Sequence, residues 1–458
     1  MAHRILKREQ KLSSKNEELN LKAINKMKSG FYNLVAIPFA RILIFFAKMF
    51  NKKLARREKD APATLSQLKK VEKGPNKRIW VHAASMGEFE QAKPIIEKIK
   101  SRIKGIQVIV SFFSPSGYEN QKNYPNADAV AYLPFDTLKN VNEFLDIAKP
   151  DIVIFVRYEI WRNYLEQINL RKIPSFLACA TEPSGKLMKS FLLKSFSKKN
   201  YNFFTGIFTV GPSHTKFFRD LGVSTKLDTL SDTRYDRIIE NIRLGKEKML
   251  LQEGLFGEGE FILVAGSTWK PDEDIIIPAI EKLSGKGKII RAVFVPHEPT
   301  TEHVNALKNK LNKAVLLSGL LNMKVKNTTL TEIKAYLADN HLIVDSVGKL
   351  LSLYKYAALA YVGGGYGAGV HSVAEPAGYG IPLACGPKHT NSHDAVNLLQ
   401  SGALSITGNT SQFLNWLEMY YDSQEKRQTA GKVAKDYIFV NKGATEIIVN
   451  RLTEYLSL

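Results

Sequence analysis

The chain has 458 residues, of which 44% are hydrophobic and 24% charged, and this composition excludes a chain that is disordered throughout. Its 65 lysines and arginines outnumber its 44 aspartates and glutamates, and the net charge of +21 indicates a nucleic acid, an anionic membrane surface or an anionic substrate as partner. The length predicts about two or three domains, and two cysteines are too few for a disulfide framework or a multi-thiolate metal site.

The N-terminal 58 residues are expected to form a basic tail, a membrane anchor and a basic collar. Residues 1–30 are polar and basic. Residues 31–50 have the length of a membrane-spanning helix, but they contain Pro38, Arg41 and Lys48, and no signal-peptide cleavage site follows. We therefore predict an anchor that lies in the membrane plane or inserts shallowly, with a collar facing an anionic leaflet; a buried core helix is the alternative. The collar consists of Lys52, Lys53, Arg56 and Arg57.

From residue 79 on, short β-branched runs alternate with helical patterns, which predicts an α/β fold with parallel sheets covered on both faces. The expected strands are 79–83, 106–112, 152–156 and 175–178 in a first half, and 261–265, 291–295, 342–344, 358–362 and 381–384 in a second. The expected helices are 89–100, 138–148 and 160–169, then 275–283, 347–356 and 373–379. Residues 231–259, with a charged helix between, are interpreted as a linker, and 412–458 as two or three helices. Because ligands bind at the carboxyl ends of strands in open parallel sheets, two facing halves predict a site in the cleft between them.

Two polar motifs follow predicted strands of the first half. Ser85, Gly87 and Glu88 come after strand 79–83, where the Glu88 carboxylate can act as a general base towards a hydroxyl. A capping box between Ser85 and Glu88 is the alternative interpretation. Arg157 and Glu159 follow strand 152–156 and form either a functional charged cluster or a structural pair on the rim.

Two further motifs follow strands of the second half. Gly266, Ser267 and Thr268 form a tight turn before a helix, and its free N–H groups predict a phosphate or anion pocket. The acidic residues after this turn favour helix initiation over metal binding. Five of the seven residues 363–369 are glycines, a density that indicates close backbone approach or positive φ; a flexible surface loop is the alternative. His371 and Ser372 are expected to open the next helix, with Glu375 one turn in. Phosphate groups of a bound donor molecule would lie over this loop and the start of the helix. Glu375 would reach a pair of ribose hydroxyl groups.

Several other polar residues can be interpreted as structural instead of functional. His297 follows a strand and faces the cleft or stands as a solvated loop histidine. His82 lies inside an apolar strand and is interpreted as a satisfied core histidine. Arg234 and Arg237 are expected to pair with neighbouring aspartates.

Taken together, the chain resembles the 3-deoxy-D-manno-octulosonic acid (Kdo) transferases of Gram-negative lipopolysaccharide assembly. The resemblance is carried by residues 82–88 (HAASMGE), 158–163 (YEIWRN), 232–237 (DTRYDR), 266–268 (GST) and 371–376 (HSVAEP), in this order. The apolar segment near the N-terminus is similar to the family's membrane anchor. The resemblance extends from about residue 31 to the C-terminal helices.

The resemblance implies a GT-B fold, in which two Rossmann-like domains face a central cleft. We accordingly assign residues 59–240 to an acceptor domain and 241–458, with the terminal helices, to a nucleotide-sugar domain. It also implies CMP-Kdo as donor, a lipid A precursor as acceptor, and anchoring at the cytoplasmic face of the inner membrane. Glu88 would deprotonate the acceptor hydroxyl, the anomeric configuration would invert and CMP would leave, with no metal or other cofactor.

The same resemblance assigns the remaining site residues. The acceptor-binding residues are Ser85, Gly87, Arg157 and Glu159. The donor-binding residues are Gly266, Ser267, Thr268, His297, Gly363, Gly364, Gly365, His371, Ser372 and Glu375.

The chain departs from the family pattern at several positions. The family usually has Glu at position 157 and Pro at 162, and often Arg at 297 and Asn at 372, where this chain has Arg157, Arg162, His297 and Ser372. These departures leave open a GT-B transferase that uses a different nucleotide sugar. A non-enzymatic basic protein that binds membranes or nucleic acid is a third hypothesis, supported only by charge. Since no nucleic-acid motif is present, nucleic acid is the least expected partner.

Overall fold

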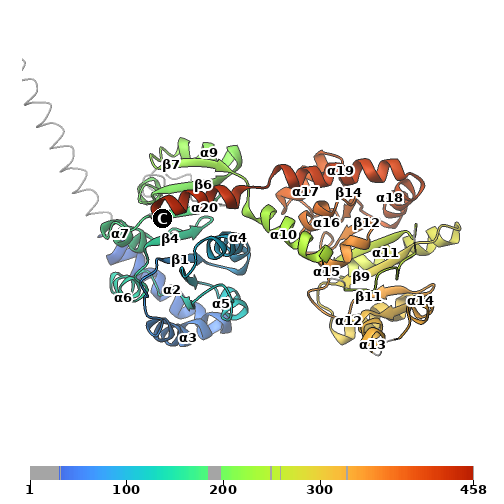
Figure 1. The fold of residues 1–458 in the computed structure, drawn as a ribbon, viewed down its shortest axis with the longest axis horizontal. Coiled ribbons are helices and arrows are strands. Elements are labelled where there is room, and N and C mark those ends of the chain that lie inside the picture. Colours follow the sequence, from blue (N-terminus) through green and yellow to red (C-terminus); the bar gives the residue numbers. More distant parts are fainter. Residues whose placement is uncertain are drawn as a thin grey trace, which may run out of the picture. The chain divides into compact units, whose positions relative to one another are not determined.

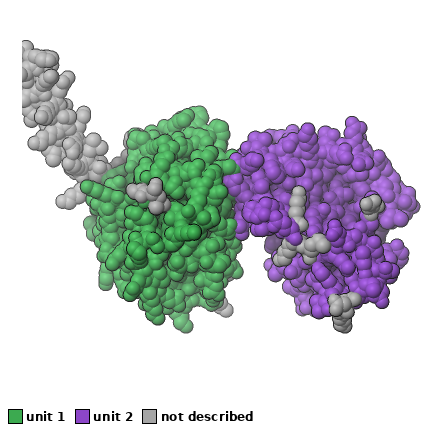
Figure 2. Space-filling view, in the orientation of Figure 1, with its two compact units in different colours: residues 1–234, 443–458 green, residues 235–442 purple. Residues whose placement is uncertain are grey.

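The computed structural model describes residues 30, 32–183, 197–247, 250–257, 259–325 and 328–456. The chain forms two compact units, Met1–Arg234 with Gly443–Leu458, and Tyr235–Lys442 (Figure 1, Figure 2). Each unit is built on a seven-stranded sheet in which every described strand pair is parallel. The predicted α/β class with two Rossmann-like domains is confirmed. The expected basic tail, residues 1–29, lies outside the described residues.

The sheet of the first unit has the strand order β3-β2-β1-β4-β5-β6-β7. Its strands are β1 (Arg78–Ala83), β2 (Gln107–Phe112), β3 (Ala129–Tyr132), β4 (Ile152–Val156), β5 (Ser175–Ala180), β6 (Gly206–Val210) and β7 (Lys226–Leu230). Alternate residues of β1 face opposite sides: Ile79 and Val81 join one apolar cluster, and Trp80 joins the other. Because both faces are buried, the strand reads as an almost continuous apolar run.

Helices cover both faces of this sheet. The first face is covered by α4 (Met86–Arg102), α5 (Pro115–Gln121) and α20 (Ala444–Tyr455). The second is covered by α3 (Lys52–Lys69), α6 (Leu138–Ala148), α7 (Arg162–Leu170) and α9 (Gly211–Asp220). Both faces therefore have their own apolar core, and the carboxyl ends of the strands stay available to polar loops.

The sheet of the second unit has the order β10-β11-β9-β8-β12-β13-β14. Its strands are β8 (Ile262–Thr268), β9 (Arg291–Pro296), β10 (Ala314–Leu316), β11 (His341–Ile343), β12 (Leu359–Val362), β13 (Leu383–Cys385) and β14 (Leu404–Ile406). One face is covered by α11 (Lys270–Gly285), α12 (Thr301–Lys310) and α18 (Thr410–Asp422). The other is covered by α10 (Thr233–Glu247), α13 (Leu317–Val325), α14 (Leu330–Leu337), α16 (Ala374–Tyr379), α17 (His393–Gln400) and α19 (Gln424–Val440). A short α15 (Leu350–Leu353) continues into a 3-10 turn, Tyr354–Tyr356.

The predicted domain assignment is wrong at the C-terminus. The sequence analysis placed 443–458 in the second domain, but α20 belongs to the first unit. Ile448, Val449 and Leu452 lie in the apolar cluster that β1 and α4 build, so burying this helix face requires the first sheet. The boundary falls between Arg234 and Tyr235 instead of at residue 240. The charged helix expected within 231–259 is α10.

The apolar N-terminal segment is helical. A π-helical turn, η1 (Tyr32–Ala36), leads into α2 (Ile37–Phe50). Together they form 19 residues with a mean hydropathy of 1.7, which by length and composition could cross a membrane, and little of this segment is buried. Phe46 is 56% exposed and Phe50 89%, so the alternative of a buried core helix is wrong.

The collar that should follow this segment is not formed as expected. Arg57 is buried, and its guanidinium donates to the carbonyls of Phe113 and Leu133 and lies over the Phe113 ring. It therefore fastens α3 to the sheet instead of facing a leaflet. Arg56 is exposed but lies 3.5 Å from Asp60 and 3.3 Å from Glu119. The side chains of Lys52 and Lys53 lie outside the described residues.

Candidate active site

Glu88 lies at the start of α4, directly after the carboxyl end of β1. The capping box is present: Ser85 Oγ accepts the N–H of Glu88, and Glu88 Oε2 accepts the N–H groups of Ala84 (2.5 Å) and Ser85 (3.2 Å). The side chain is only 4% exposed. Burial, reinforced by the charge of Glu159, raises the pKa of Glu88 to about 7. Gly87 is exposed, and a Cβ there would meet nothing within 4 Å.

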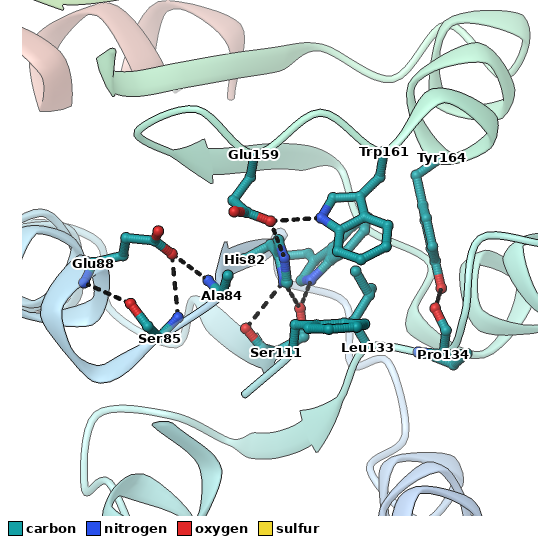
Figure 3. A network of polar contacts seen from close by, with 12 residues as sticks. His82, Ala84, Ser85, Glu88, Ser111, Leu133, Pro134, Glu159, Trp161 and Tyr164 are labelled. Atoms are coloured by element: carbon teal, nitrogen blue, oxygen red, sulfur yellow. Dashed lines mark hydrogen bonds and ion pairs between the residues drawn. The ribbon is translucent and has the colours of Figure 1, made fainter. Parts of the chain in front are cut away.

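Glu159 lies in the loop after β4 and faces the same end of the sheet (Figure 3). Its Oε2 accepts the indole N–H of Trp161 at 2.8 Å and lies 3.5 Å from Nε2 of His82. The Trp161 ring meets the His82 ring edge to face, with centroids 6.0 Å apart. The structure therefore brings Glu88 and Glu159 into one electrostatic neighbourhood, with a histidine and a tryptophan fixing the second carboxylate.

His82 is fully buried, as expected of a core histidine, but one ring nitrogen points to Glu159. Its Nδ1 lies 2.9 Å from Ser111 Oγ, which also accepts the indole N–H of Trp80 at 2.8 Å. Nδ1 also lies 3.2 Å from the carbonyl oxygen of Ser111, so Ser111 contacts this nitrogen through both of its oxygens while Nε2 faces Glu159. Sequence reasoning missed this role; the signal was a polar residue inside an otherwise apolar strand.

Arg157 has an unusual backbone conformation at the end of β4. Its φ is 73°, in the left-handed region that residues with a Cβ seldom adopt, and its N–H donates to the carbonyl of Ala178 at 2.8 Å. Its Nε is buried and has no hydrogen-bond partner among the described residues. The guanidinium lowers the pKa of Glu88, against the larger effects of burial and Glu159. Strained backbone of this kind often marks a functional loop.

The glycine-rich loop of the second unit lies against the last residues of β8. A Cβ on Gly363 would be 2.2 Å from the carbonyl oxygen of Ser267, and one on Gly365 would be 2.7 Å from the backbone of Gly386. Only glycine fits at these two contacts. Ser267 itself has φ 53°. The predicted tight turn at Gly266–Thr268 is wrong, because these residues are the end of strand β8, where the pairing with β9 is irregular between Gly266 and Thr268. They still lie beside the glycine loop at the carboxyl ends of β8 and β12.

Two histidines stack beside this loop. The rings of His297 and His371 are 4.2 Å apart and nearly parallel, and the indole N–H of Trp269 donates to Nε2 of His371 at 3.2 Å. Burial and the neighbouring His297 lower the pKa of His371. His297 is exposed, and its N–H donates to the carbonyl of Thr268. His297 therefore belongs to the predicted donor cluster instead of standing alone in a loop.

The helix after the glycine loop begins later than predicted. α16 starts at Ala374 and has six residues, so His371 and Ser372 precede it and do not open it. Ser372 is exposed, and Glu375 lies half-buried in the first turn of α16. Several loop N–H groups are already occupied within the protein, because Gly367 and Gly369 both donate to the carbonyl of Gly364. The loop is therefore internally braced before any ligand arrives.

Asp272 holds this region together, and sequence reasoning assigned it only to helix initiation. Its carboxylate accepts the N–H of Trp269 at 2.9 Å, the hydroxyl of Tyr361 at 2.7 Å and the N–H of Gly364 at 3.1 Å. One buried side chain thus joins the start of α11, strand β12 and the glycine loop. Next to it, buried Glu273 accepts from Thr268 Oγ1. Among the described residues, no group of three or more His, Cys, Asp or Glu side chains could hold a metal ion.

The first unit also carries two open grooves along α2. One, of about 820 Å³, is lined by apolar side chains that include Ile37, Phe45 and Phe46. The other, of about 930 Å³, lies between α2, α3 and the start of α6 and shares Phe45 and Arg41 with the first. Arg41 and Lys139 are exposed there, and neither makes an ion pair with any described residue.

The family model that matches this chain covers most of the first unit. Residues 52–237 match the family model described as 3-Deoxy-D-manno-octulosonic-acid transferase (kdotransferase). A 3-deoxy-D-manno-octulosonic acid transferase from Haemophilus influenzae is 24% identical over 388 residues, which cover 83% of this chain and 88% of the relative. A second such transferase, from Rickettsia bellii, is also 24% identical, and the alignment covers 93% of this chain and 97% of the relative. Over residues 52–237 the chain is therefore similar to Kdo transferases, and the two relatives extend this similarity over most of its length.

Solved structures agree with the fold of this glycosyltransferase. A UDP-GlcNAc 2-epimerase from Neisseria meningitidis has a TM-score of 0.54 at 13% identity and covers 82% of this chain and 100% of its own. MurG from Acinetobacter baumannii has a TM-score of 0.50 at 14% identity and covers 82% and 99%. At these identities the likeness shows the GT-B fold alone.

The Kdo transferase match covers one part of the predicted site. Ser85, Gly87, Glu88, Arg157 and Glu159 all lie within the matched residues 52–237. The predicted donor-binding residues lie outside that match, where the two curated relatives still align over most of the chain. The similarity to Kdo transferases therefore extends over both units.

Proposed function

We propose that this enzyme transfers Kdo from CMP-Kdo to a lipid A precursor in lipopolysaccharide assembly. The single observation that carries the proposal is Glu88, a buried carboxyl at a strand end whose pKa is raised to about 7. A group with this pKa can accept a proton from a sugar hydroxyl near neutral pH and release it after turnover. The named relatives, which are Kdo transferases, supply the substrate class.

The proposed reaction is a single displacement. The Glu88 carboxylate takes the proton of the acceptor hydroxyl, and the oxygen forms a bond to the anomeric carbon of Kdo. The bond from that carbon to the CMP phosphate oxygen breaks on the opposite side, so the configuration inverts and CMP leaves with the electron pair. The loop Gly363–Gly365, with His371 and His297 beside it, would bind the nucleotide and its leaving phosphate without a metal ion.

We further propose that the acceptor arrives from the inner membrane at its cytoplasmic face. The exposed apolar side chains of α2 suit the acyl region, and the grooves along α2 have room for acyl chains. Arg41 and Lys139 supply positive charge beside those grooves for phosphate groups of the lipid. Arg157, whose buried Nε lacks a described partner, would receive an anionic group of the acceptor near Glu88.

The deciding experiment is the mass of the lipid product. Purified protein in detergent is incubated with CMP-Kdo and a tetraacylated lipid A precursor, with an established Kdo transferase in parallel. We expect the lipid to gain the mass of one or more Kdo residues. A control that is active beside a protein that adds no sugar would refute the proposal.

The nucleotide preference is tested separately, because His297 and Ser372 depart from the family pattern. Thermal shift measurements compare CMP, UDP, GDP and ADP at equal concentration. We expect CMP to raise the melting temperature most. Stabilisation by UDP and not by CMP would instead favour a GT-B transferase with a different donor.

A further inference from the structure

The start of the apolar segment is hydrogen-bonded into the first unit. The Tyr32 hydroxyl donates to Asp136 Oδ2 at 2.7 Å. Asn33 and Asn163 exchange side-chain hydrogen bonds in both directions, at 3.1 and 2.7 Å. We call these four residues, Tyr32, Asn33, Asp136 and Asn163, the latch. In α2 itself only Ile37 is buried, and its Lys48 pairs with Glu58 of α3, so the polar contacts of η1 are one of the links between this exposed helix and the first unit.

The inner side of the latch is the N-terminus of α7. The Asp136 carboxylate is 1% exposed and accepts the N–H groups of Asn163 and Tyr164, each at 3.1 Å. The Asn163 amide also donates to the Asp136 carbonyl at 2.6 Å. Burial raises the pKa of Asp136 to about 6, so its charge depends on these donors. Tyr32 supplies one of them from the apolar segment.

The same helix end positions Glu159. The N-cap of α7 is Trp161, whose indole N–H donates to Glu159 Oε2 at 2.8 Å. Trp161 also packs on the ring of Phe113 and against His82. Only Arg162 separates Trp161 from Asn163 in the chain. A shift of η1 would therefore move the Asn163 end of this turn and, through Trp161, the carboxylate that raises the pKa of Glu88.

We propose that Tyr32 and Asn33 are positioning residues for catalysis, which hold the start of α7 and so keep the Glu159 loop in place when α2 is seated in the membrane. The inference rests on the proposed function, since it assigns turnover to Glu88. It goes further by making the apolar segment part of the active-site scaffold, in addition to a membrane anchor.

The test uses the full chain with Tyr32→Phe and Asn33→Ala combined. Leu34→Ala is the matched control, because Leu34 lies next to the latch and is 78% exposed. Vesicles of phosphatidylethanolamine and phosphatidylglycerol carry the lipid A precursor, and flotation measures binding. We expect both variants to bind vesicles as the wild type does. The latch variant should lose about tenfold in kcat, with KM for CMP-Kdo within twofold, and the control should keep wild-type kcat.

A kcat of the latch variant within twofold of the wild type would overturn the proposal. So would a kcat loss matched by an equal loss of vesicle binding, because the segment would then act only as an anchor. An equal loss in Leu34→Ala would also contradict it.

Hydrogen exchange makes the test independent of the substrate. We expect amide exchange over residues 158–165 to be faster in the latch variant than in the wild type or in Leu34→Ala. We also expect vesicles to slow exchange there in the wild type but not in the latch variant. If the wild type adds no Kdo, the proposed function fails and this measurement alone decides the latch. Equal exchange in all three proteins would refute it.

Discussion

At the scale of single residues, Glu88 combines a structural and a chemical role. A carboxylate that accepts two backbone N–H groups would ordinarily have a lowered pKa. Here burial and the like charge of Glu159 outweigh those two hydrogen bonds, and the pKa rises to about 7. The cap holds Oε2 in place, and no hydrogen bond from a described residue reaches Oε1. The cap and the general base are therefore compatible interpretations of one side chain.

The first prediction separates these two roles. In Glu88→Gln, the amide oxygen can still accept from Ala84 and Ser85, but the side chain can no longer take a proton. We expect kcat to fall by at least about 100-fold, in the range typical of a lost general base, while CMP binding stays unchanged. Product mass spectrometry and CMP titration measure the two effects. Glu90→Gln, two residues along the same helix, should keep its activity. A Glu88→Gln kcat within tenfold of the wild type would contradict the assignment.

The second prediction concerns pH. The base works as a carboxylate, so kcat/KM should be lost as the pH falls through about 7, the raised pKa of Glu88. Because the charge of Glu159 is one cause of this raised pKa, Glu159→Gln should lower it and move the acidic limb of the profile to lower pH. The profile is measured with each protein on the same vesicles. A midpoint that stays in place or rises in Glu159→Gln would rule out this coupling.

Local sequence shows some of these residues and hides others. Ser85 and Glu88 could be predicted as a cap and as a base because both interpretations depend on spacing within one turn. The part played by His82 could not, because its partners Ser111 and Glu159 are 29 and 77 positions away in the sequence. Local sequence does not show which of two strand faces meets a distant loop.

At the scale of elements, the glycine loop is held in place by a hydrogen bond from the N–H of Gly364 to the buried carboxylate of Asp272. The contact between Asp272 and Gly364 spans 92 positions, so helix-start statistics correctly indicated a cap but missed the loop. The long apolar strands β1 and β4 were predicted nearly to the residue because both their faces are buried. Strand β7 was missed because it lies at the sheet edge and its sequence, KLDTL, is mostly polar.

The third prediction tests this support for the loop. In Asp272→Asn, one of the two oxygens becomes an NH₂ group, so either Tyr361 or the pair of Trp269 and Gly364 loses its acceptor. We expect a loss of about 1–3 kcal/mol in the free energy of unfolding, since buried donors lose their acceptor. The KM for the donor should rise as well. Denaturant titration and steady-state kinetics measure both. Asp274→Asn, which changes an exposed carboxylate paired with Lys270, is the control. Equal effects in the two variants would contradict a special role of Asp272.

At the scale of the whole molecule, the positive charge is distributed differently from the predicted collar. Arg57 is buried and donates to the carbonyl of Leu133, and Arg56 lies close to Asp60 and Glu119. Two exposed cations without an ion pair among the described residues, Arg41 and Lys139, instead flank the grooves along α2. Composition could indicate an anionic partner. It could not show where the positive charge lies, because that depends on which arginines are buried in the fold.

The last prediction concerns α20, which closes the chain back onto the first unit. Leu452 is fully buried in the cluster of β1 and α4, so Leu452→Ala should lower the free energy of unfolding by about 2–5 kcal/mol. Ile447 lies on the same helix but is 49% exposed, so Ile447→Ala should change the free energy of unfolding by less than about 0.5 kcal/mol. Because the buried face of the helix lies in the first unit's core, hydrogen exchange should quicken over 78–112 and not over 262–296. Equal quickening in both ranges would show that α20 stabilises the second sheet too, contrary to its place in the fold.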